Sequence, residues 1–365
     1  MILCANPRAQ YLAHRAEIDA AITRVLLSGR YILGEEVTAF ESEFAAYVGA
    51  ECGVGVGSGT EALHLALRAC GVNAGDEVIT VSHTAVATVS AIELCGATPV
   101  LVDIDPESFT MDPECLEPRL SARTKAVVVV HLYGQAAELE VIIGFARRHN
   151  LRVVEDCAQA HGARYRDRPV GSWGDVGCFS FYPTKNLGAL GDGGMLVTSD
   201  RELAARARRL REYGWGERYV SELPGWNSRL DAIQAAVLRA KLSHLESDNA
   251  ARRDRARTYE GGLRDLSLVA PREAPGRAHV YHLYVVRSPQ RDALKAHLEG
   301  AGVAALIHYP VPVHLQPAYR GRLPGADDLD ETERAAREVL SLPMYPELTE
   351  QEQGVVITAV RAFRG

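Results

Sequence analysis

The chain has 365 residues, of which 47% are hydrophobic and 24% are charged, with a formal net charge of −7. This composition is typical of a globular protein of about two domains and argues against a disordered or fibrous chain. The negative charge and scattered basic residues argue against non-specific nucleic-acid binding, and no apolar run approaches the roughly 18 residues of a membrane-spanning helix.

Short apolar runs rich in valine and isoleucine dominate the first part of the chain. They are CGVGV (52–56), DEVITVS (76–82), TPVLVDI (98–104), KAVVVVHL (125–132) and LRVVEDC (151–157). Because polar and apolar residues hardly alternate in them, they predict buried parallel strands.

Helical patterns lie between and after these runs. TEALHLALRACG (60–71) has an apolar face and a glycine placed to end the helix, and helices are also expected within 136–150 and 199–214. The alternation of strands and helices predicts an α/β fold with a mostly parallel central sheet.

The pattern changes after about residue 230. Residues 229–263 predict one long unbroken helix, followed by a strand at 280–287, a helix around 291–302 and two more helices near the C-terminus. We therefore expect a large domain over residues 1–245 and a smaller α+β domain over residues 246–365.

A glycine-rich turn joins the first strand to its helix in GVGVGSGTEALHLAL. Ser58 and Thr60 stand where a third glycine of a dinucleotide fingerprint would be required, so an NAD-type site is disfavoured. Backbone N–H groups, two hydroxyls and a helix N-terminus would suit one phosphate monoester. A tight turn with a capping Ser or Thr explains the turn equally well.

An acidic residue, Asp156, ends the strand in VVEDCAQAHG, where ligands bind in open α/β sheets. It could hold a protonated ring nitrogen, or it could be an ordinary helix cap. Lys185 follows in FSFYPTKNLGALGDGG, between an aromatic stretch and glycines. A phosphate nest, an acid and an amine in this order are what pyridoxal 5′-phosphate (PLP) requires: an anchor, a partner for the pyridine nitrogen and a nucleophile.

Several longer stretches resemble the DegT–StrS type of PLP-dependent nucleotide-sugar aminotransferases. They include SGRYILGEEVTAFESEFAAYVG, GSGTEALHLAL, HLYGQ, VEDCAQAHGARY, FSFYPTKNLGALGDGG, NSRLDAIQAAVLRAKL and HYPVPVHLQPAY, and they extend over nearly the whole chain. The resemblance implies the aspartate-aminotransferase-like fold, fold type I, and a homodimer with shared active sites.

The resemblance also implies residue roles. Lys185 would bind the cofactor covalently and act as the general base, and Asp156 would pair with the pyridinium nitrogen. The remaining cofactor-binding residues would be Gln159 beside the phenolate oxygen, Ser58, Gly59, Thr60 and Ser180 at the phosphate, and Asn227 reaching the phosphate from the partner subunit. His161 is expected behind the site, and no metal is expected.

One position departs from the family. An aromatic residue usually stacks on the pyridine ring within the SHTxVAT pattern, but Ala85 stands there, and His83 is the candidate to replace it.

The segment HYPVPVHLQPAY is similar to the corresponding segment of enzymes that aminate C3 of a dTDP-linked keto-6-deoxyhexose. Tyr182, Arg218, His308, Tyr309 and His314 would then bind the sugar nucleotide, with loop packing as the alternative for the last three, and L-glutamate would be the amino donor. Amination at C4 and a PLP-binding regulatory protein without turnover are the alternatives. A lysine rather than a histidine at position 185 argues against a dehydratase.

Seven cysteines are scattered from Cys4 to Cys178 without a CxxC pair. An odd and scattered set predicts reduced thiols. The N-terminus also lacks the basic and apolar regions of a secretory signal. We therefore expect a cytoplasmic protein that binds neither nucleic acid nor membrane.

Overall fold

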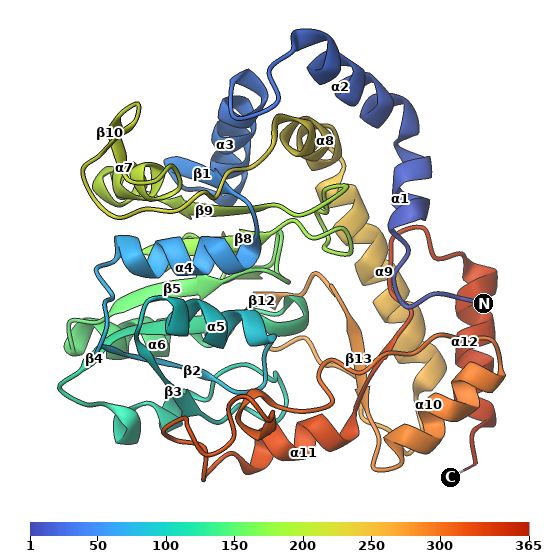
Figure 1. Ribbon diagram of the computed structural model, residues 1–365. Helices are drawn as coiled ribbons and strands as arrows, with labels where there is room; N and C mark the ends of the chain where they lie inside the picture. Colours follow the sequence, from blue (N-terminus) through green and yellow to red (C-terminus); the bar gives the residue numbers. More distant parts are fainter. Residues whose placement is uncertain (365) are drawn as a thin grey trace.

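The computed structural model describes residues 1–364 and is built around a seven-stranded sheet with the strand order β1-β9-β8-β5-β4-β2-β3 (Figure 1). Its strands are β1 (Cys52–Val56), β2 (Glu77–Val81), β3 (Thr98–Val102), β4 (Thr124–Val130), β5 (Arg152–Asp156), β8 (Val176–Ser180) and β9 (Gly194–Thr198). All five strands expected from the apolar runs are present. The strands β2, β3, β4, β5 and β8 pair in parallel, whereas β9 is antiparallel to both of its neighbours, β1 and β8. The expectation of parallel pairing is therefore wrong for β1, while the sheet as a whole is mostly parallel as predicted.

Helices cover both faces of the sheet because alternate strand residues belong to different hydrophobic clusters. Val78, Val128 and Val154 pack with α4, α5 and α7, whereas their sequence neighbours pack with α3, α6 and α8. Burial on both faces explains why the strands show little polar alternation. These helices and the two that precede them are α1 (Pro7–Ala13), α2 (Arg15–Ser28), α3 (Glu35–Val48), α4 (Gly59–Ala69), α5 (Val86–Leu94), α6 (Leu139–Arg148), α7 (Arg201–Leu210) and α8 (Ala232–Leu242).

The helix boundaries follow the predicted signals. Gly71 adopts a left-handed φ of 86° just after α4, and the Asp200 side chain accepts the backbone N–H groups of Glu202 and Leu203 to cap α7.

The expected single helix over 229–263 is wrong. It is two helices, α8 and α9 (Leu245–Leu263), separated at Ser243 and His244. The Ser243 hydroxyl donates to the Ala240 carbonyl at 2.8 Å. The two helices then pack against different partners, α8 against α2 and α3, and α9 against α12. Tertiary packing thus breaks a helix that has no glycine or proline at the break.

The C-terminal elements form a separate hydrophobic cluster beside the sheet (Figure 1). They are α9, β13 (Tyr284–Arg287), α10 (Arg291–Gly300), β14 (Val339–Leu342) and α12 (Glu350–Ala362), with β13 antiparallel to β14. The helix that precedes β14, α11 (Asp330–Glu338), instead places Ala335 in the hydrophobic cluster of the central sheet. The predicted helices are present here, but the strand expected over 280–287 begins only at Tyr284, because Tyr281 has a φ of 43°. The beginning of α9 coincides with the predicted domain boundary at 245, which stays a prediction.

The N-terminal residues leave the large domain and join the C-terminal elements. Ile2 forms a parallel bridge to Val303, its N–H donates to the Gly302 carbonyl at 2.8 Å, and the Cys4 carbonyl accepts the N–H of Met344 at 3.0 Å. The chain therefore connects the two parts of the molecule at both ends of the large domain.

Two small sheets complete the fold. One contains β6 (Arg164–Tyr165), β7 (Arg168–Pro169) and β12 (Arg277–Ala278), and the other is a hairpin of β10 (Trp215–Glu217) and β11 (Val220–Ser221). Within residues 1–364, no helix combines the length and apolar character needed to cross a membrane.

Candidate active site

The phosphate-binding candidates meet where β1 turns into α4. The Ser58 hydroxyl caps the helix by accepting the Glu61 N–H at 3.2 Å. A Cβ atom at Gly59 would lie 2.5 Å from the Ser180 Cβ, so the helix N-terminus and the end of β8 are in close contact. The structure therefore brings Ser58, Gly59, Thr60 and Ser180 together, although β1 and β8 are not neighbours in the sheet. A hydroxyl-lined helix N-terminus is a suitable environment for a phosphate.

Asp156 lies buried at the C-terminal end of β5. Its Oδ2 accepts the Thr88 hydroxyl at 2.8 Å, and its Oδ1 accepts the Ala158 N–H at 3.1 Å. Burial raises the pKa of the Asp156 carboxyl, while these two donors and the amine of Lys185 oppose that rise. A cation bound beside this carboxylate would replace the lost hydration and hold it ionised.

Lys185 lies in the loop after β8, where its N–H donates to the Tyr182 carbonyl at 2.8 Å. Burial lowers the pKa of the Lys185 amine to about 8, an effect that nearby Asp156 partly offsets. An amine with this pKa is still mostly protonated near physiological pH, but its neutral, nucleophilic fraction is far larger than that of an ordinary lysine.

The same loop is held by a second buried amine. The Lys241 ammonium, on α8, donates to the carbonyl of Gly188. Since Gly188 follows Lys185 by three residues, this contact restrains the loop that carries the nucleophile. The sequence offered no sign of this role, because Lys241 is one of several basic residues on a helical pattern.

Gln159 uses both ends of its amide within the protein. Its Oε1 accepts the Tyr133 N–H at 2.7 Å, and its Nε2 donates to the Tyr309 hydroxyl at 3.1 Å. Burial raises the pKa of Tyr309 to about 12, so its hydroxyl stays protonated. The predicted contact between Gln159 and the cofactor stays a prediction.

Tyr133 connects two of the predicted histidines. Its hydroxyl lies 2.8 Å from the His83 Nε2 and donates to the backbone carbonyl of His308. His83 is fully buried, its Nδ1 has no partner among the described residues, and burial lowers its pKa to about 4. His83 lies just before Ala85, the N-cap of α5, and contacts Phe109 and Tyr133. Tyr133 was missed as a site residue; its signal was the HLYGQ motif, where it adopts a φ of 60°.

Burial lowers the pKa of His161 to about 3, and the positive charge of nearby Lys185 adds to this lowering. Both of its ring nitrogens lack partners among the described residues, and it packs against Phe44, Phe179 and Phe181. This location agrees with a supporting role behind the site.

The substrate candidates are placed very differently from one another. Tyr182 is 53% exposed, and the ring of His308 lies 2.8 Å from the Ser341 hydroxyl. His314 is buried, with Nδ1 2.8 Å from the Ser82 hydroxyl and Nε2 3.4 Å from Glu333, a geometry that favours the loop-packing alternative. Arg218 is exposed between β10 and β11 and lies over the Tyr219 ring.

Asn227 is exposed on the surface of the chain, next to the buried Ser228. The Ser228 hydroxyl lies 3.2 Å from the Gly57 N–H and 2.9 Å from the Glu61 carboxylate, beside the candidate phosphate site. Ser228 therefore ties the segment that carries Asn227 to the turn before α4.

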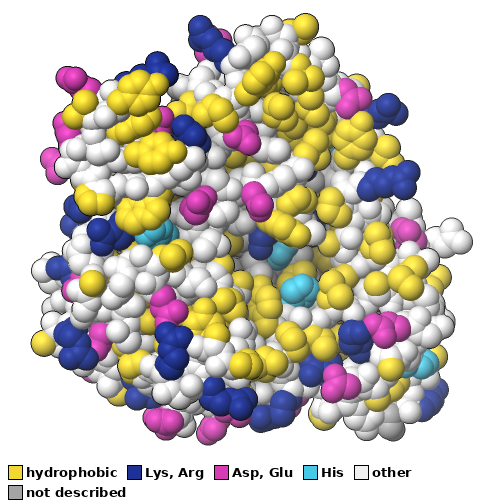
Figure 2. Space-filling model, in the orientation of Figure 1, with side chains coloured by type: hydrophobic (Ala, Val, Ile, Leu, Met, Phe, Trp, Pro, Cys, Tyr) yellow, Lys and Arg dark blue, Asp and Glu magenta, His cyan; other side chains and the backbone are white. Residues whose placement is uncertain are grey.

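The residues present fit PLP. An anion cradle, a buried carboxylate and an amine of lowered pKa lie at the ends of the central strands, and the unpartnered Nδ1 of His83 can still accept a hydrogen bond. The surface is hollowed near the centre of the face in Figure 2, where histidine and basic side chains are visible. Ser58, Gly59, Thr60 and Ser180 would hold the phosphate, Asp156 the ring nitrogen and Lys185 the aldehyde carbon.

Comparisons with known proteins agree with this chemistry. The family model of DegT/DnrJ/EryC1/StrS aminotransferases matches residues 13–361. The chain is 51% identical over 357 residues to the dTDP-3-amino-3,4,6-trideoxy-alpha-D-glucose transaminase of Streptomyces venezuelae, covering 98% of this chain and 94% of that protein. It is 46% identical to a pleiotropic regulatory protein of Geobacillus stearothermophilus, covering 97% and 96% of the two chains.

Among solved structures, the crystal structure of S. venezuelae DesV in complex with a ketimine intermediate superposes with a TM-score of 0.96 at 50% identity, covering 99% of this chain and 97% of that chain. The family, the architecture of fold type I and the PLP-compatible site all agree. The chain therefore belongs to the DegT/DnrJ/EryC1/StrS aminotransferase family and is a PLP-dependent aminotransferase.

Proposed function

We propose that this enzyme transfers the amino group of L-glutamate to the C3 ketone of a dTDP-linked keto-6-deoxyhexose. The observation that carries the proposal is that Lys185 and buried Asp156 lie near enough for each charge to shift the pKa of the other, which suits transamination chemistry. The position of the amino group is supported by the name of the Streptomyces venezuelae relative, a 3-amino sugar transaminase that is similar along almost its whole length.

The protein's own groups have distinct tasks. PLP supplies an aldehyde that accepts an amino group and a ring that withdraws electrons from the bond being broken. The Asp156 carboxylate would stabilise positive charge on the ring nitrogen, and Thr88 and Ala158 keep its two oxygens oriented. The Lys185 amine, with a pKa near 8, can both accept and return a proton at neutral pH.

Substrate binding is assigned to the exposed side of the site. Tyr182 and Tyr309 present hydroxyls that can bind sugar oxygens, and Arg218 presents a guanidinium to a diphosphate. Hydrogen bonds hold His308 and Tyr309 in place, through Ser341 and Gln159 respectively. This rigidity would orient the ketone for one carbon over its neighbour. For His314, burial supports a packing role instead.

The key test compares wild type with Lys185→Ala and with Lys241→Met as a control. Wild type should bind PLP with visible absorbance that bleaches on addition of L-glutamate, and Lys185→Ala should lose covalent attachment and turnover. Lys241→Met removes a second buried amine that restrains the same loop, so turnover should fall but stay measurable, and covalent attachment of PLP should persist. A Lys185→Ala protein with wild-type turnover would contradict the proposed catalysis.

The alternatives are separated by the product. NMR analysis of the aminosugar formed from dTDP-ketosugars should show nitrogen on C3, and nitrogen on C4 would support the C4 alternative. A regulatory protein would bind PLP without any change of absorbance on addition of glutamate.

We infer that the active enzyme is a homodimer in which Asn227 completes the partner's phosphate site. Asn227 is exposed in the single chain while its segment is fixed through Ser228, and this exposure supports the inference. Mixing Lys185→Ala with Asn227→Ala protein should produce hybrid dimers with one intact site and recover about a quarter of wild-type activity. No recovery after subunit exchange would contradict sharing of the site. A cytoplasmic location is proposed from the odd, scattered cysteines.

A further inference from the structure

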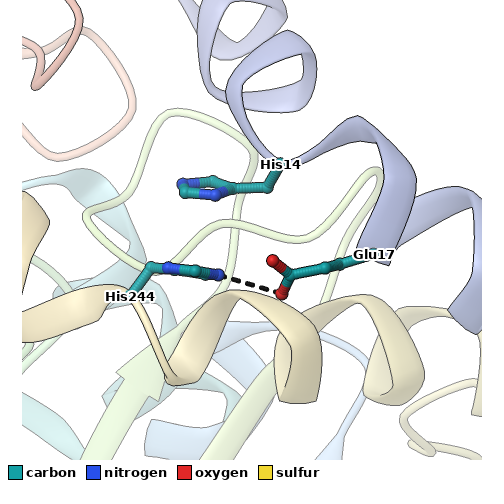
Figure 3. Close-up of side chains that lie close together, drawn as sticks. All are labelled: His14, Glu17 and His244. Carbon is teal, nitrogen blue, oxygen red and sulfur yellow. Dashed lines mark hydrogen bonds and ion pairs between the residues drawn. The ribbon is translucent and has the colours of Figure 1, made fainter.

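Two histidines and a glutamate gather away from the active site, where two helix junctions meet. His14 lies between α1 and α2, Glu17 lies in the first turn of α2, and His244 lies between α8 and α9. The two imidazole rings are stacked with centroids 4.0 Å apart and an interplanar angle of 19°. The His244 Nε2 lies 2.9 Å from the Glu17 Oε2, and Figure 3 shows the ring of His14 above this pair.

The cluster leaves coordinating capacity unused. Glu17 is an ion-pair partner of His244 but not of His14, and the Nε2 of His14 is shielded from water without a hydrogen-bond partner among residues 1–364. Stacking of two imidazoles does not itself use their in-plane lone pairs, so each ring has a nitrogen available to a cation. The side chain of Glu17 is 54% exposed and that of His244 is 30% exposed, which opens a path from solvent.

We propose that His14, Glu17 and His244 form a binding site for a divalent transition-metal cation of the zinc type. One nitrogen from each histidine and one Glu17 oxygen already lie within 4.8 Å of one another. Ligands placed about 2.0–2.2 Å from a tetrahedral zinc ion lie roughly 3.4 Å apart. A rotation of the His14 ring about its Cβ–Cγ bond and a small shift of Glu17 would bring the donors to that spacing. Imidazole and carboxylate donors favour zinc, nickel or copper over magnesium or calcium.

A second group of potential metal ligands is less suited to bind a cation than the group around His14. His131, Glu155 and Cys157 are also close together, but all three are buried. Glu155 there accepts hydrogen bonds from His131 and from the backbone of Gly171, Trp173 and Gly174. A cation would have to displace these bonds, whereas at His14 it would displace only the exposed hydrogen bond between His244 and Glu17.

Binding would connect parts of the chain that are far apart in sequence. It would fasten the α1–α2 junction to the α8–α9 junction, two segments separated by most of the large domain. Residues Asn6 and Gln10, just before His14, line a cavity of about 20 Å³ together with Lys185. The cation would therefore bind on the same N-terminal segment that borders this cavity, without touching Lys185.

The test is calorimetric titration of the PLP-loaded enzyme with Zn²⁺, comparing wild type with His14→Ala, His244→Ala and His149→Ala. His149 is the matched control, because it forms a surface pair with Glu117 at 3.4 Å but is not among the residues grouped here. Wild type and His149→Ala should bind one Zn²⁺ equally. Each ligand variant should bind at least about 10–100-fold more weakly, the loss seen even for residues behind the ligands.

Thermal unfolding provides a second measurement. Zn²⁺ at a hundredfold excess over its Kd should raise the Tm of wild type by roughly 3 °C, and should raise that of each ligand variant by no more than about half as much. Since neither histidine belongs to the catalytic machinery, both variants should keep aminotransferase activity, which confirms that they fold. Equal Zn²⁺ affinity in wild type and the two ligand variants, or no wild-type binding below millimolar Zn²⁺, would overturn the proposal.

Discussion

The contact between Gly59 and Ser180 allows a quantitative test of the phosphate cradle. In Gly59→Ala the new Cβ would lie 2.5 Å from the Ser180 Cβ and 3.0 Å from its Cα. Carbon atoms pack favourably at about 3.5–4.0 Å, so the overlap is about 1 Å, and the backbone of Ser180 cannot rotate out of the way. Either α4 or the end of β8 must move, and the cradle must widen.

Two effects of opposite sign can be separated. Alanine favours a helix over glycine by up to about 1 kcal/mol, which would stabilise the variant. Overpacking costs about 1–3 kcal/mol, so we expect the clash to outweigh this gain and the apoenzyme to be destabilised by up to about 2 kcal/mol. Because the helix preference acts with and without cofactor, PLP affinity should report the displaced cradle alone. Overpacking energy that the apoenzyme relieves by widening the cradle reappears when PLP binds, so the two losses share one total. If the apoenzyme is little destabilised, PLP affinity should fall by about 5- to 150-fold.

The assay combines urea unfolding of the apoenzyme with titration of PLP. Gly261→Ala is the matched control, because Gly261 lies in α9 and its added Cβ would meet no atom within 4 Å. This control should be as stable as wild type or up to about 1 kcal/mol more stable, with unchanged PLP affinity. A Gly59→Ala protein that behaves like the control in both measurements would refute the close contact.

Three further predictions concern buried polar groups. Tyr133→Phe removes the partner of the His83 Nε2 and should lower the free energy of unfolding by about 1–3 kcal/mol; no loss in urea unfolding would show that the histidine finds another partner. Arg211→Met leaves the Glu41 carboxylate buried without its cation and should lower the free energy of unfolding by about 3–5 kcal/mol; wild-type stability would contradict a dependence on this pair. Only the neutral amine of Lys185 attacks the cofactor, so the rate of PLP attachment to apoenzyme should rise with pH and level off above about pH 8; a rate still rising near the ordinary lysine value of 10.5 would contradict the lowered pKa.

The fold was largely predictable where a segment's pattern depends on its own burial. The valine-rich strands are buried on both faces, and this leaves an unmistakable run of apolar residues. By contrast, β9 and β14 were not predicted as strands: β9 follows a glycine-rich loop and β14 begins directly where α11 ends. The break between α8 and α9 depends on which surfaces the two helices contact, and no glycine or proline at residues 243–244 indicates it in the sequence.

The candidate site shows the same division. Lys185 and Asp156 carry chemistry that the sequence order itself reveals, and the structure places them close enough for the carboxylate to influence the amine. Thr88, Tyr133 and Lys241 act on other residues rather than on a ligand, so their importance depends on distances that no spacing encodes. His314 shows the reverse, because its motif indicated a ligand contact while its burial favours packing.

The bridge between Ile2 and Val303 has a consequence for synthesis of the chain. A ribosome adds about 5–20 residues per second, so roughly 300 residues separate the appearance of the two partners by about 15–60 s. During that interval the first residues have no native neighbour, although the strands of the central sheet can already pair. Until the segment around Val303 has been synthesised, residues near Ile2 therefore stay unpaired and accessible to chaperones and proteases.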